Sequence, residues 1–275
     1  RLFGWEEVSP EGSFSDVPKD KWYAAAVETA AAHDALPAGS RAFRPEDNIT
    51  REEMAVIIVR GLGYAPLAPA AAELGSPFTD VTASEGFIAI AYDTGIISGM
   101  EKGRFAPGDT ATREQAAAVL VRVYDRLQEP SVQLESAGEY RLVTISTPMA
   151  RGGEKMPVTP LEPLPELYAA LRRMKNNGED MARMVLQLMA GGVRTITDAG
   201  GNPVAASTLI SAKEVQEVLG RKDVKTFYSE GYQSAYCVYA PNAYQSATVW
   251  YQSEESMAAK LQLARLFGVT RYVLE

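Results

Sequence analysis

One pattern occurs twice in the N-terminal half of this 275-residue chain. Its first copy joins FSDV at residues 14–17 to FRPEDNITRE at 43–52, and its second joins FTDV at 78–81 to FAPGDTATRE at 105–114. An aromatic residue, an aspartate and Thr-Arg-Glu thus recur in the same order and at nearly the same spacing. Self-similarity of this kind predicts repeated structural modules, so the first half of the chain must be read as two like units.

Each unit is predicted to contain two helices joined by a loop. The first helix is mainly apolar and covers residues 22–32 in one unit and 87–92 in the other. The second begins at Thr-Arg-Glu, because a hydroxyl at the start and a longer polar side chain three residues later form a capping box. The two pairs are Thr50 with Glu53 and Thr112 with Gln115. Apolar residues then recur near the helical period, so one face of each second helix should be buried.

Several other polar residues have expected structural roles. Asp16 and Asp80 are expected to accept backbone amides at turns or helix starts. His33, the single histidine, lies at a helix end and is expected to be a C-cap residue. The single cysteine, Cys237, cannot form an internal disulfide, and its tyrosine neighbours indicate a packed strand.

The negative charge is confined to the repeats. Residues 1–130 hold 12 Lys and Arg against 20 Asp and Glu, a net charge of −8, whereas residues 131–275 hold 15 of each kind. A domain this acidic is not drawn to nucleic acid or to an anionic membrane by its overall field, so neither is an expected partner. No run of about 18 uncharged apolar residues is present, which predicts no membrane span. Residue 1 is an arginine, and we expect it to mark a cut in a longer chain.

The two units resemble the S-layer homology module. The likeness is carried in the first copy by FSDVP, Trp22-Tyr and ITREEM at 49–54, and in the second by FTDV, GIISG at 95–99, FAPGD and ATREQ at 111–115. RLFGW at 1–5 also resembles the tail of a preceding copy, because RGLGY at 60–64 ends the next copy in the same manner. We therefore expect the tail of a repeat at 1–12 and whole repeats at 13–66 and 77–128.

The resemblance implies an all-α, pseudo-threefold bundle that binds secondary cell-wall polysaccharide, often carrying a pyruvyl ketal, in grooves between neighbouring modules. It also implies peptidoglycan-associated glycan as a partner, and an extracellular, cell-wall or S-layer location. The polysaccharide-binding residues predicted on this basis are Arg51, Arg113, Trp22, Ser98 and Gly99.

The chemistry of these residues suits a sugar that carries a carboxylate. Arg51 and Arg113 stand at helix starts, where a guanidinium beside the positive end of the helix dipole can hold a carboxylate by paired hydrogen bonds. Trp22 could stack on a sugar face, although Gly86 and Phe87 take its place in the second copy. Two plainer interpretations stay open: each arginine is solvated or paired with the adjacent glutamate, and the tryptophan belongs to the core.

A different pattern follows a polar segment at 127–138, which contains Pro130 and is typical of a domain boundary. Strand-like and helical segments then alternate, so residues 138–275 are predicted to form an α/β domain with parallel packing. The predicted strands are 140–146, 184–190, 247–251 and 268–273, and the predicted helices are 164–175 and 256–266. Residues 195–244 are expected to be an inserted excursion.

This second half resembles the closing part of a family 18 glycoside hydrolase, a (β/α)8 barrel. The likeness rests mainly on 247–275, where VWYQSEES at 249–256 precedes KLQLAR at 260–265. A glycan cleft in this domain would be lined by Trp250, Tyr251 and Glu254, although a solvated loop is the simpler interpretation of the glutamate.

The catalytic signature of that family is absent from the sequence. The family's DxxDxE strand supplies the glutamate that protonates the glycosidic oxygen, and no DxxDxE occurs in this chain. Residues 145–148 read ISTP where the family has Tyr-Asp after a methionine, and Tyr272 replaces the closing tryptophan. Three explanations stay open: the rest of the barrel lies upstream, the domain has decayed into a scaffold, or the chain is a fragment.

No other catalytic chemistry is indicated. The sequence has no glycine-rich phosphate loop and no paired histidines, so no catalytic residue, cofactor or metal is predicted. The leading hypothesis is noncovalent anchoring to wall polysaccharide, with a catalytically incomplete glycosidase-like domain. One alternative is a fragment of a surface-anchored family 18 hydrolase acting on cell-wall or chitin-like glycan. Another is a structural S-layer lattice protein.

Overall fold

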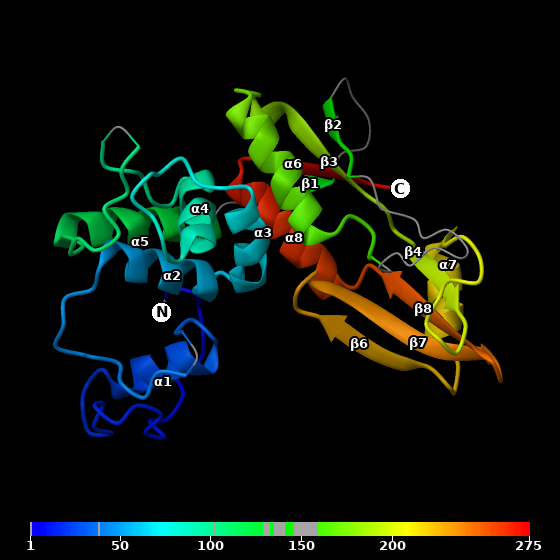
Figure 1. The fold of residues 1–275 in the computed structure, drawn as a ribbon, viewed down its shortest axis with the longest axis horizontal. Helices are drawn as coiled ribbons and strands as arrows, with labels where there is room; N and C mark the ends of the chain where they lie inside the picture. Colours follow the sequence, from blue (N-terminus) through cyan, green and yellow to red (C-terminus); the bar gives the residue numbers. More distant parts are fainter. Residues whose placement is uncertain (1, 38, 102, 129–132, 135–140, 146–158) are drawn as a thin grey trace. The chain divides into compact units, whose positions relative to one another are not determined.

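A computed structural model describes residues 2–37, 39–101, 103–128, 133–134, 141–145 and 159–275. The chain divides into two compact units, Arg1–Pro130 and Ser131–Glu275 (Figure 1). The protein is thus multidomain and contains both helices and sheets. In the part that the structure describes, no single helix is long and apolar enough to cross a membrane; one sharply bent pair, Arg51–Gly61 with Ala65–Glu73, meets that criterion by length and composition alone.

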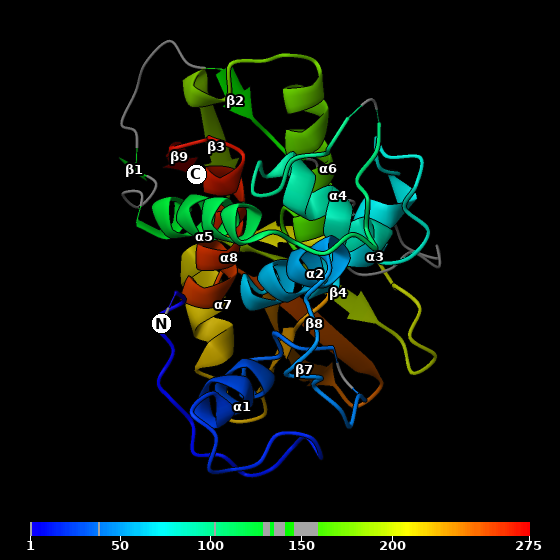
Figure 2. The same ribbon diagram turned by 90° about the vertical axis from the view of Figure 1, so that its left-hand side faces the viewer.

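The described part of the first unit is built from helices. They are α1 (Ala24–Ala32), α2 (Arg51–Gly61), the 3-10 helix η1 (Ala65–Leu67), α3 (Ala68–Glu73), α4 (Glu85–Asp93) and α5 (Arg113–Gln128). α1 and α2 belong to the first repeat, and α4 and α5 belong to the second. Figures 1 and 2 both show α4 beside α2 and α3, on which it packs. η1 overlaps the end of the first predicted repeat and α3 lies between the two predicted repeats; neither is among the predicted elements.

Both predicted capping boxes are present. The hydroxyl of Thr50 accepts the N–H of Glu53 at 3.1 Å, and the Glu53 carboxylate accepts the N–H of Thr50 at 2.8 Å. Thr112 and Gln115 make the same two bonds, each at 3.2 Å. These bonds satisfy amides at the helix starts, so each Thr-Arg-Glu sequence begins a helix as predicted. His33 is also confirmed as the C-cap of α1, and its ring stacks on another aromatic side chain, that of the N-terminal tryptophan.

Asp16 and Asp80 each hold a loop that lies 25 to 28 residues further along the chain. Asp16 accepts the N–H groups of Phe43 and Arg44 at 2.8 and 2.7 Å, and Asp80 accepts those of Phe105 and Ala106, both at 2.8 Å. The prediction that these aspartates accept backbone amides is confirmed, and Asp16 lies in the turn closed by the bond from the N–H of Val17 to the carbonyl oxygen of Phe14; the amides that the two aspartates accept, however, belong to a distant loop and not to a local turn or helix start. Arg44 and Ala106 have left-handed φ angles of 61° and 57°, and this conformation turns two successive amides toward one carboxylate.

A parallel sheet of four strands forms one layer of the second unit. Its order is β1-β9-β3-β2, and the strands are β1 (Gln133–Leu134), β2 (Arg141–Val143), β3 (Met184–Leu188) and β9 (Arg271–Leu274). A 3-10 turn, η2 (Met181–Arg183), leads into β3, and helices α6 (Leu164–Asn176) and α8 (Glu254–Leu266) pack together. The predicted parallel packing is confirmed for these strands. Residues 146–148, most of the ISTP sequence, lie outside the described residues.

The second sheet of this unit has five strands and is antiparallel. Its order is β5-β4-β8-β7-β6, and the strands are β4 (Gly192–Thr197), β5 (Thr208–Ile210), β6 (Lys225–Ser229), β7 (Ser234–Asn242) and β8 (Gln245–Tyr251). The prediction that 247–251 joins a parallel sheet is therefore wrong. Only two residues separate β7 from β8, and so short a connection allows antiparallel pairing alone.

The inserted excursion predicted at 195–244 supplies most of this second sheet. Helix α7 (Ala212–Leu219) covers one face of it, as Figure 1 shows, and a hydrophobic core lies between helix and sheet. Cys237 is fully buried in that core, which confirms the predicted packed strand, and burial raises the pKa of its thiol.

Candidate functional site

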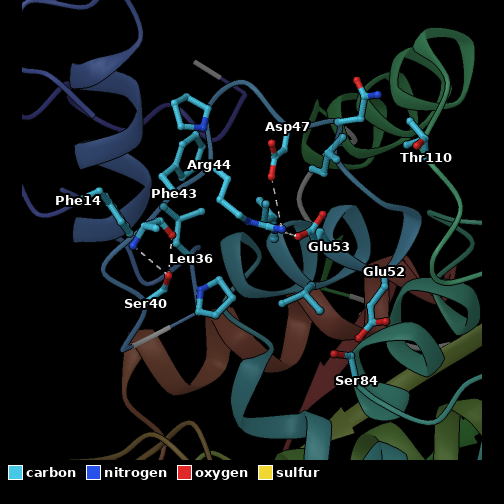
Figure 3. A pocket seen from close by; sticks show the side chains of 18 residues that line it. Phe14, Leu36, Ser40, Phe43, Arg44, Asp47, Glu52, Glu53, Ser84 and Thr110 are labelled. Carbon is cyan, nitrogen blue, oxygen red and sulfur yellow. Dashed lines mark hydrogen bonds and ion pairs between the residues drawn. The ribbon is translucent and has the colours of Figure 1, made fainter. Parts of the chain in front are cut away.

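A cavity of about 690 Å³ opens in the first unit. Its walls come from the loop at 36–49, from one face of α2, and from Ser84, Thr110 and Ala111 of the second repeat. Figure 3 shows Phe14, Leu36 and Phe43 at one end, and Arg44 with Glu53 and Asp47 in the centre. Because both repeats contribute residues, the cavity is a groove between neighbouring modules, and we call it the groove below.

The groove combines aromatic and charged side chains. At one end, Phe14 and Phe43 pack together with ring centroids 5.8 Å apart. In the centre, Arg44 forms an ion pair with Glu53, and its Nη1 lies 3.8 Å from Oδ2 of Asp47 (Figure 3). Burial alone would raise the pKa of Glu53, but hydrogen bonds from the helix start and from Arg44 outweigh burial and lower the pKa. The carboxylate therefore stays charged at neutral pH.

Arg51, a predicted ligand residue, lies between the two repeats and does not line the groove. Its Nε donates to the carbonyl oxygen of Phe105 at 2.8 Å, and its Nη2 donates to that of Ser98 at 2.9 Å. The guanidinium lies 4.7 Å from the centre of the Phe105 ring, and only 4% of the residue is exposed. Burial lowers the pKa of Arg51, and the charges of Asp109 and Asp80 oppose this shift. The structure thus brings Arg51 and Ser98 together, and their hydrogen bond links the first repeat to the second.

The other three predicted binding residues of the repeats lie apart from the groove-lining residues. Trp22 is 92% exposed, so the interpretation that it belongs to the core is wrong. A Cβ at Gly99 would lie 2.4 Å from the Phe78 ring, so this position needs a glycine for packing. Arg113 is exposed and, among the residues that the structure describes, has no partner in a hydrogen bond or ion pair.

The three residues predicted to line a glycan cleft in the second unit do not converge. Trp250 is 7% exposed and is enclosed by Tyr236 and Tyr232, whose ring centroids lie 4.6 and 5.7 Å away. Tyr251 follows Trp250 on β8, so it faces the other side of the sheet, against the core beneath α7. Glu254 is exposed in the first turn of α8.

A buried polar cluster in the second unit was not predicted. Nζ of Lys260 donates to the carbonyl oxygen of Leu161 at 2.7 Å and to Oε1 of Gln252 at 3.1 Å, and lies 3.4 Å from Oε2 of Glu162. Lys260 is 1% exposed and Glu162 is 2% exposed. Burial lowers the pKa of Lys260 to about 8 and raises that of Glu162. The sequence signal was a lysine on the apolar face of a helix, which requires a buried partner, but that partner lies 98 residues away.

Comparison with known protein families identifies the helical repeats. Residues 13–55 and 77–117 match the family model described as the S-layer homology domain. Both repeats are S-layer homology domains.

Two curated proteins are similar in sequence to about half of this chain. The chain is 34% identical over 137 residues to the endoglucanase of Bacillus sp. (strain KSM-635). The matched segment covers 49% of this chain and 14% of that protein. The chain is also 32% identical over 136 residues to a cell surface protein of Thermoanaerobacter kivui. That match covers 47% of this chain and 18% of that protein. The chain thus spans less than a fifth of the length of these relatives. The S-layer homology repeats and these relatives associate it with the extracellular cell wall or S-layer.

Two solved structures show a likeness over half of this chain. The spore cortex-lytic enzyme SleL of Bacillus cereus has a TM-score of 0.40 and 17% identity, covering 50% of this chain and 31% of that chain. A chitinase of Chromobacterium violaceum has a TM-score of 0.39 and 18% identity, covering 50% of this chain and 40% of that chain.

The two S-layer homology repeats differ at their exposed aromatic residue. The position of Trp22 is taken in the second repeat by Gly86, in the same alignment that matches Phe14 with Phe78. A Cβ at Gly86 would lie 1.8 Å from the carbonyl oxygen of Ala68, because the first residue of α3 lies directly against it. The linker helix therefore covers, in the second repeat, the surface that Trp22 presents in the first.

Proposed function

We propose that the S-layer homology repeats bind secondary cell-wall polysaccharide and so hold the chain noncovalently at the wall. The observation that carries this proposal is the groove of about 690 Å³ between the repeats. The rings of Phe14 and Phe43 offer apolar surface to the C–H faces of a sugar, while Ser40, Asn48 and Arg44 offer hydrogen-bonding groups. A concave site with apolar walls and a few polar groups is typical of ligand binding.

The charges in the groove bear on the predicted pyruvyl ketal. The lining holds one arginine, Arg44, and three carboxylates, those of Asp47, Glu52 and Glu53. A pyruvyl carboxylate would have to compete with Glu53 for Arg44. We therefore assign the groove to a neutral, hydroxyl-rich stretch of the polysaccharide or of peptidoglycan-associated glycan. Trp22, exposed outside the groove, supplies a second stacking surface in this proposal.

In this proposal Arg51, Ser98 and Gly99 position the groove without touching the sugar. The N–H of Arg51 donates to the carbonyl oxygen of Asp109 at 2.9 Å, and that of Ala111 donates to Ile49 at 3.0 Å. These bonds fix the loop that supplies Thr110 and Ala111 to the groove wall.

The second unit, we propose, is a catalytically incomplete relative of part of a (β/α)8 glycosidase barrel. The absence of DxxDxE from the sequence and the enclosure of Trp250 support this interpretation. We expect the chain to release no reducing ends from purified peptidoglycan or chitin oligosaccharides above a buffer control. Release would favour the alternative of a hydrolase fragment.

The test of anchoring is sedimentation of the full chain with purified wall sacculi. We expect binding that is lost when the secondary polysaccharide is extracted from the sacculi, and that is weakened by Asn48→Ala and by Trp22→Ala. Tyr244→Ala, which removes an aromatic side chain that is 83% exposed in the second unit, is the matched control and should bind normally. If extracted sacculi bind the chain as well as untreated sacculi do, the proposal is refuted. If sacculi that lack pyruvyl groups bind it as well as untreated sacculi do, a neutral ligand in the groove is supported.

A further inference from the structure

The five-stranded sheet of the second unit ends in an open edge strand, β6. Residues 225–229 of β6 pair with 234–238 of β7, and in the part of the chain that the structure describes no other strand pairs with β6 (Figure 1). At alternate residues of an edge strand the backbone N–H and C=O groups point away from the sheet. The outer side of β6 therefore presents backbone donors and acceptors to which a further strand can bond.

β6 lacks two of the features by which proteins block such an edge. It contains no proline, and its pairing with β7 is regular, because the register shift of β7 lies further along, between Tyr239 and Asn242. The opposite edge of the sheet, β5, is only three residues long. Since prolines, bulges and short strands discourage pairing between edges, β6 is the edge of this sheet that is suited to it.

A row of aromatic side chains crosses the sheet and ends at β6. Trp250, Tyr236 and Phe227 are paired in register on β8, β7 and β6, and their ring centroids lie 4.6 and 5.1 Å apart. These distances are close to the spacing of neighbouring strands. Exposure increases along the row, from 7% for Trp250 to 45% for Phe227. The outer side of the Phe227 ring is therefore apolar surface that a ring on a further strand would cover.

The charges along β6 favour an antiparallel neighbour of the same sequence. Lys225 is exposed at the start of the strand, and Glu230 is exposed just after its end. That end is negative, since burial and the charges of Glu255 and Glu230 raise the pKa of Tyr228 to about 12. Antiparallel alignment of two copies of β6 places the positive end of each beside the negative end of the other, whereas parallel alignment would bring like charges together.

We propose that β6 pairs antiparallel with β6 of a second copy of this chain, about a twofold axis at Phe227. In this register the two Phe227 rings lie opposite each other. Lys225 of each copy lies opposite Ser229 of the other and next to its Glu230. The two five-stranded sheets join into one, and both open edges are covered. Because each copy uses the same surface, association ends at a dimer.

The dimer carries two pairs of S-layer homology repeats. If the repeats bind the wall as proposed above, attachment of one pair raises the local concentration of the other, and the dimer is held more firmly than a single chain. Only this consequence rests on the anchoring proposal. The pairing of β6 is tested without glycan, so its failure and a failure of wall binding are distinguishable.

The experiment is analytical ultracentrifugation of the full 275-residue chain. We expect a mass that rises from one chain to two and no further, with a midpoint of about 10–100 μM because the interface is small. Hydrogen exchange on the same samples should show protection of the β6 amides that increases with concentration, and no change at β5. A single-chain mass up to about 1 mM would show that Lys225 only shields the edge and would overturn the proposal, as would a dimer in which β6 is not protected.

Exchange of the charges tests the register. Lys225→Glu alone and Glu230→Lys alone each bring like charges together at two symmetric contacts, so each should weaken dimerisation by ~10-fold or more. The double variant should dimerise again, and an equimolar mixture of the two single variants should form mixed dimers. Lys213→Glu, the same charge change at an exposed residue of α7, is the control and should dimerise as the unaltered chain does. Single variants that dimerise normally, or a double variant as weak as either single one, would contradict the proposed pairing.

Discussion

Nε of Arg51 donates a hydrogen bond of 2.8 Å to the carbonyl oxygen of Phe105, which lies 54 residues further along the chain. This bond joins the first turn of a helix in one repeat to the loop that enters the corresponding helix of the next. Together with the bond to Ser98, it buries a guanidinium whose charge is met by backbone dipoles and by nearby aspartates. A residue expected to hold a ligand therefore holds two modules in register.

Arg51→Ala should destabilise the first unit by about 2–4 kcal/mol, because it leaves buried carbonyl oxygens without donors and opens a cavity over Phe105. Arg113→Ala removes the same side chain from an exposed helix start and should change the free energy of unfolding by less than about 0.5 kcal/mol. Urea unfolding followed by the fluorescence of Trp5 and Trp22, in a Trp250→Phe background, reports on the first unit. Equal midpoints for the two variants would contradict the structural role of Arg51.

Gly86→Ala should be among the most destabilising single-methyl substitutions in the chain. The added Cβ would lie 1.8 Å from the carbonyl oxygen of Ala68, so α3 and α4 would have to separate, at a cost of roughly 2 kcal/mol or more. Gly108→Ala is the matched control, because nothing lies within 4 Å of the position that its added methyl group would take and its φ is not left-handed. Thermal unfolding followed by circular dichroism should show a lower midpoint for Gly86→Ala alone.

The first unit should lose stability in acid because of Asp16 and Asp80. Hydrogen bonds from the backbone of Phe43 lower the pKa of Asp16, and those from Phe105 lower the pKa of Asp80. A carboxyl with a lower pKa in the folded state stabilises the fold above the unfolded pKa of about 3.9, and this contribution is lost as pH falls through the folded value. Urea midpoints measured from pH 7 to pH 2 should therefore fall below about pH 4.

The variant Asp16→Asn, Asp80→Asn tests the origin of that acid dependence. Each asparagine keeps the shape but offers one acceptor oxygen and no charge to the two amides. The variant should be less stable at pH 7, and its midpoint should vary less between pH 4 and pH 2. An acid dependence identical to that of the unaltered chain would show that other carboxyl groups cause it.

Lys260 should make the second unit more stable as the solution becomes mildly alkaline. Burial lowers its pKa to about 8, while an unfolded lysine keeps a pKa of about 10.4. Between these values the unfolded chain binds a proton that the folded chain has released, so the free energy of unfolding rises with pH. The difference in urea midpoint between the native chain and Lys260→Met, followed by Trp250 fluorescence, should grow from about pH 8 to about pH 9.5, because the opposing effect of the buried Cys237 thiol, whose pKa is raised, is common to both chains. A difference that stays constant over this range would rule out a contribution from this lysine.

Much of the helical architecture could be predicted from local spacing. The pairs Thr50 with Glu53 and Thr112 with Gln115 form their capping boxes because all the interacting groups lie within one turn. The direction of β8 could not be predicted in this way. An apolar run such as 247–251 is compatible with either sheet direction, and the short turn after β7 decides between them.

The candidate site was likewise predicted only in part from the sequence. The groove borders the loops that carry the repeated pattern, but Arg51, Ser98 and Gly99 do not line it, and the lining residue Arg44 was not predicted. Neither Arg44 nor Glu162 belongs to a signature that sequence reasoning can recognise, because their partners are set by the packing of separate segments.

The sequence by itself determined that two like modules are present, where their helices begin and that an α/β unit follows, because these features depend on local hydrogen bonds and on the period of apolar residues. Only the tertiary structure decided what each copy of a repeated residue does. Arg51 and Arg113 occupy the same position in nearly the same local sequence, yet one is buried between modules and the other is exposed. Burial is decided by the segment that packs against a residue, and for these two arginines that segment lies far away along the chain or is absent from the described residues.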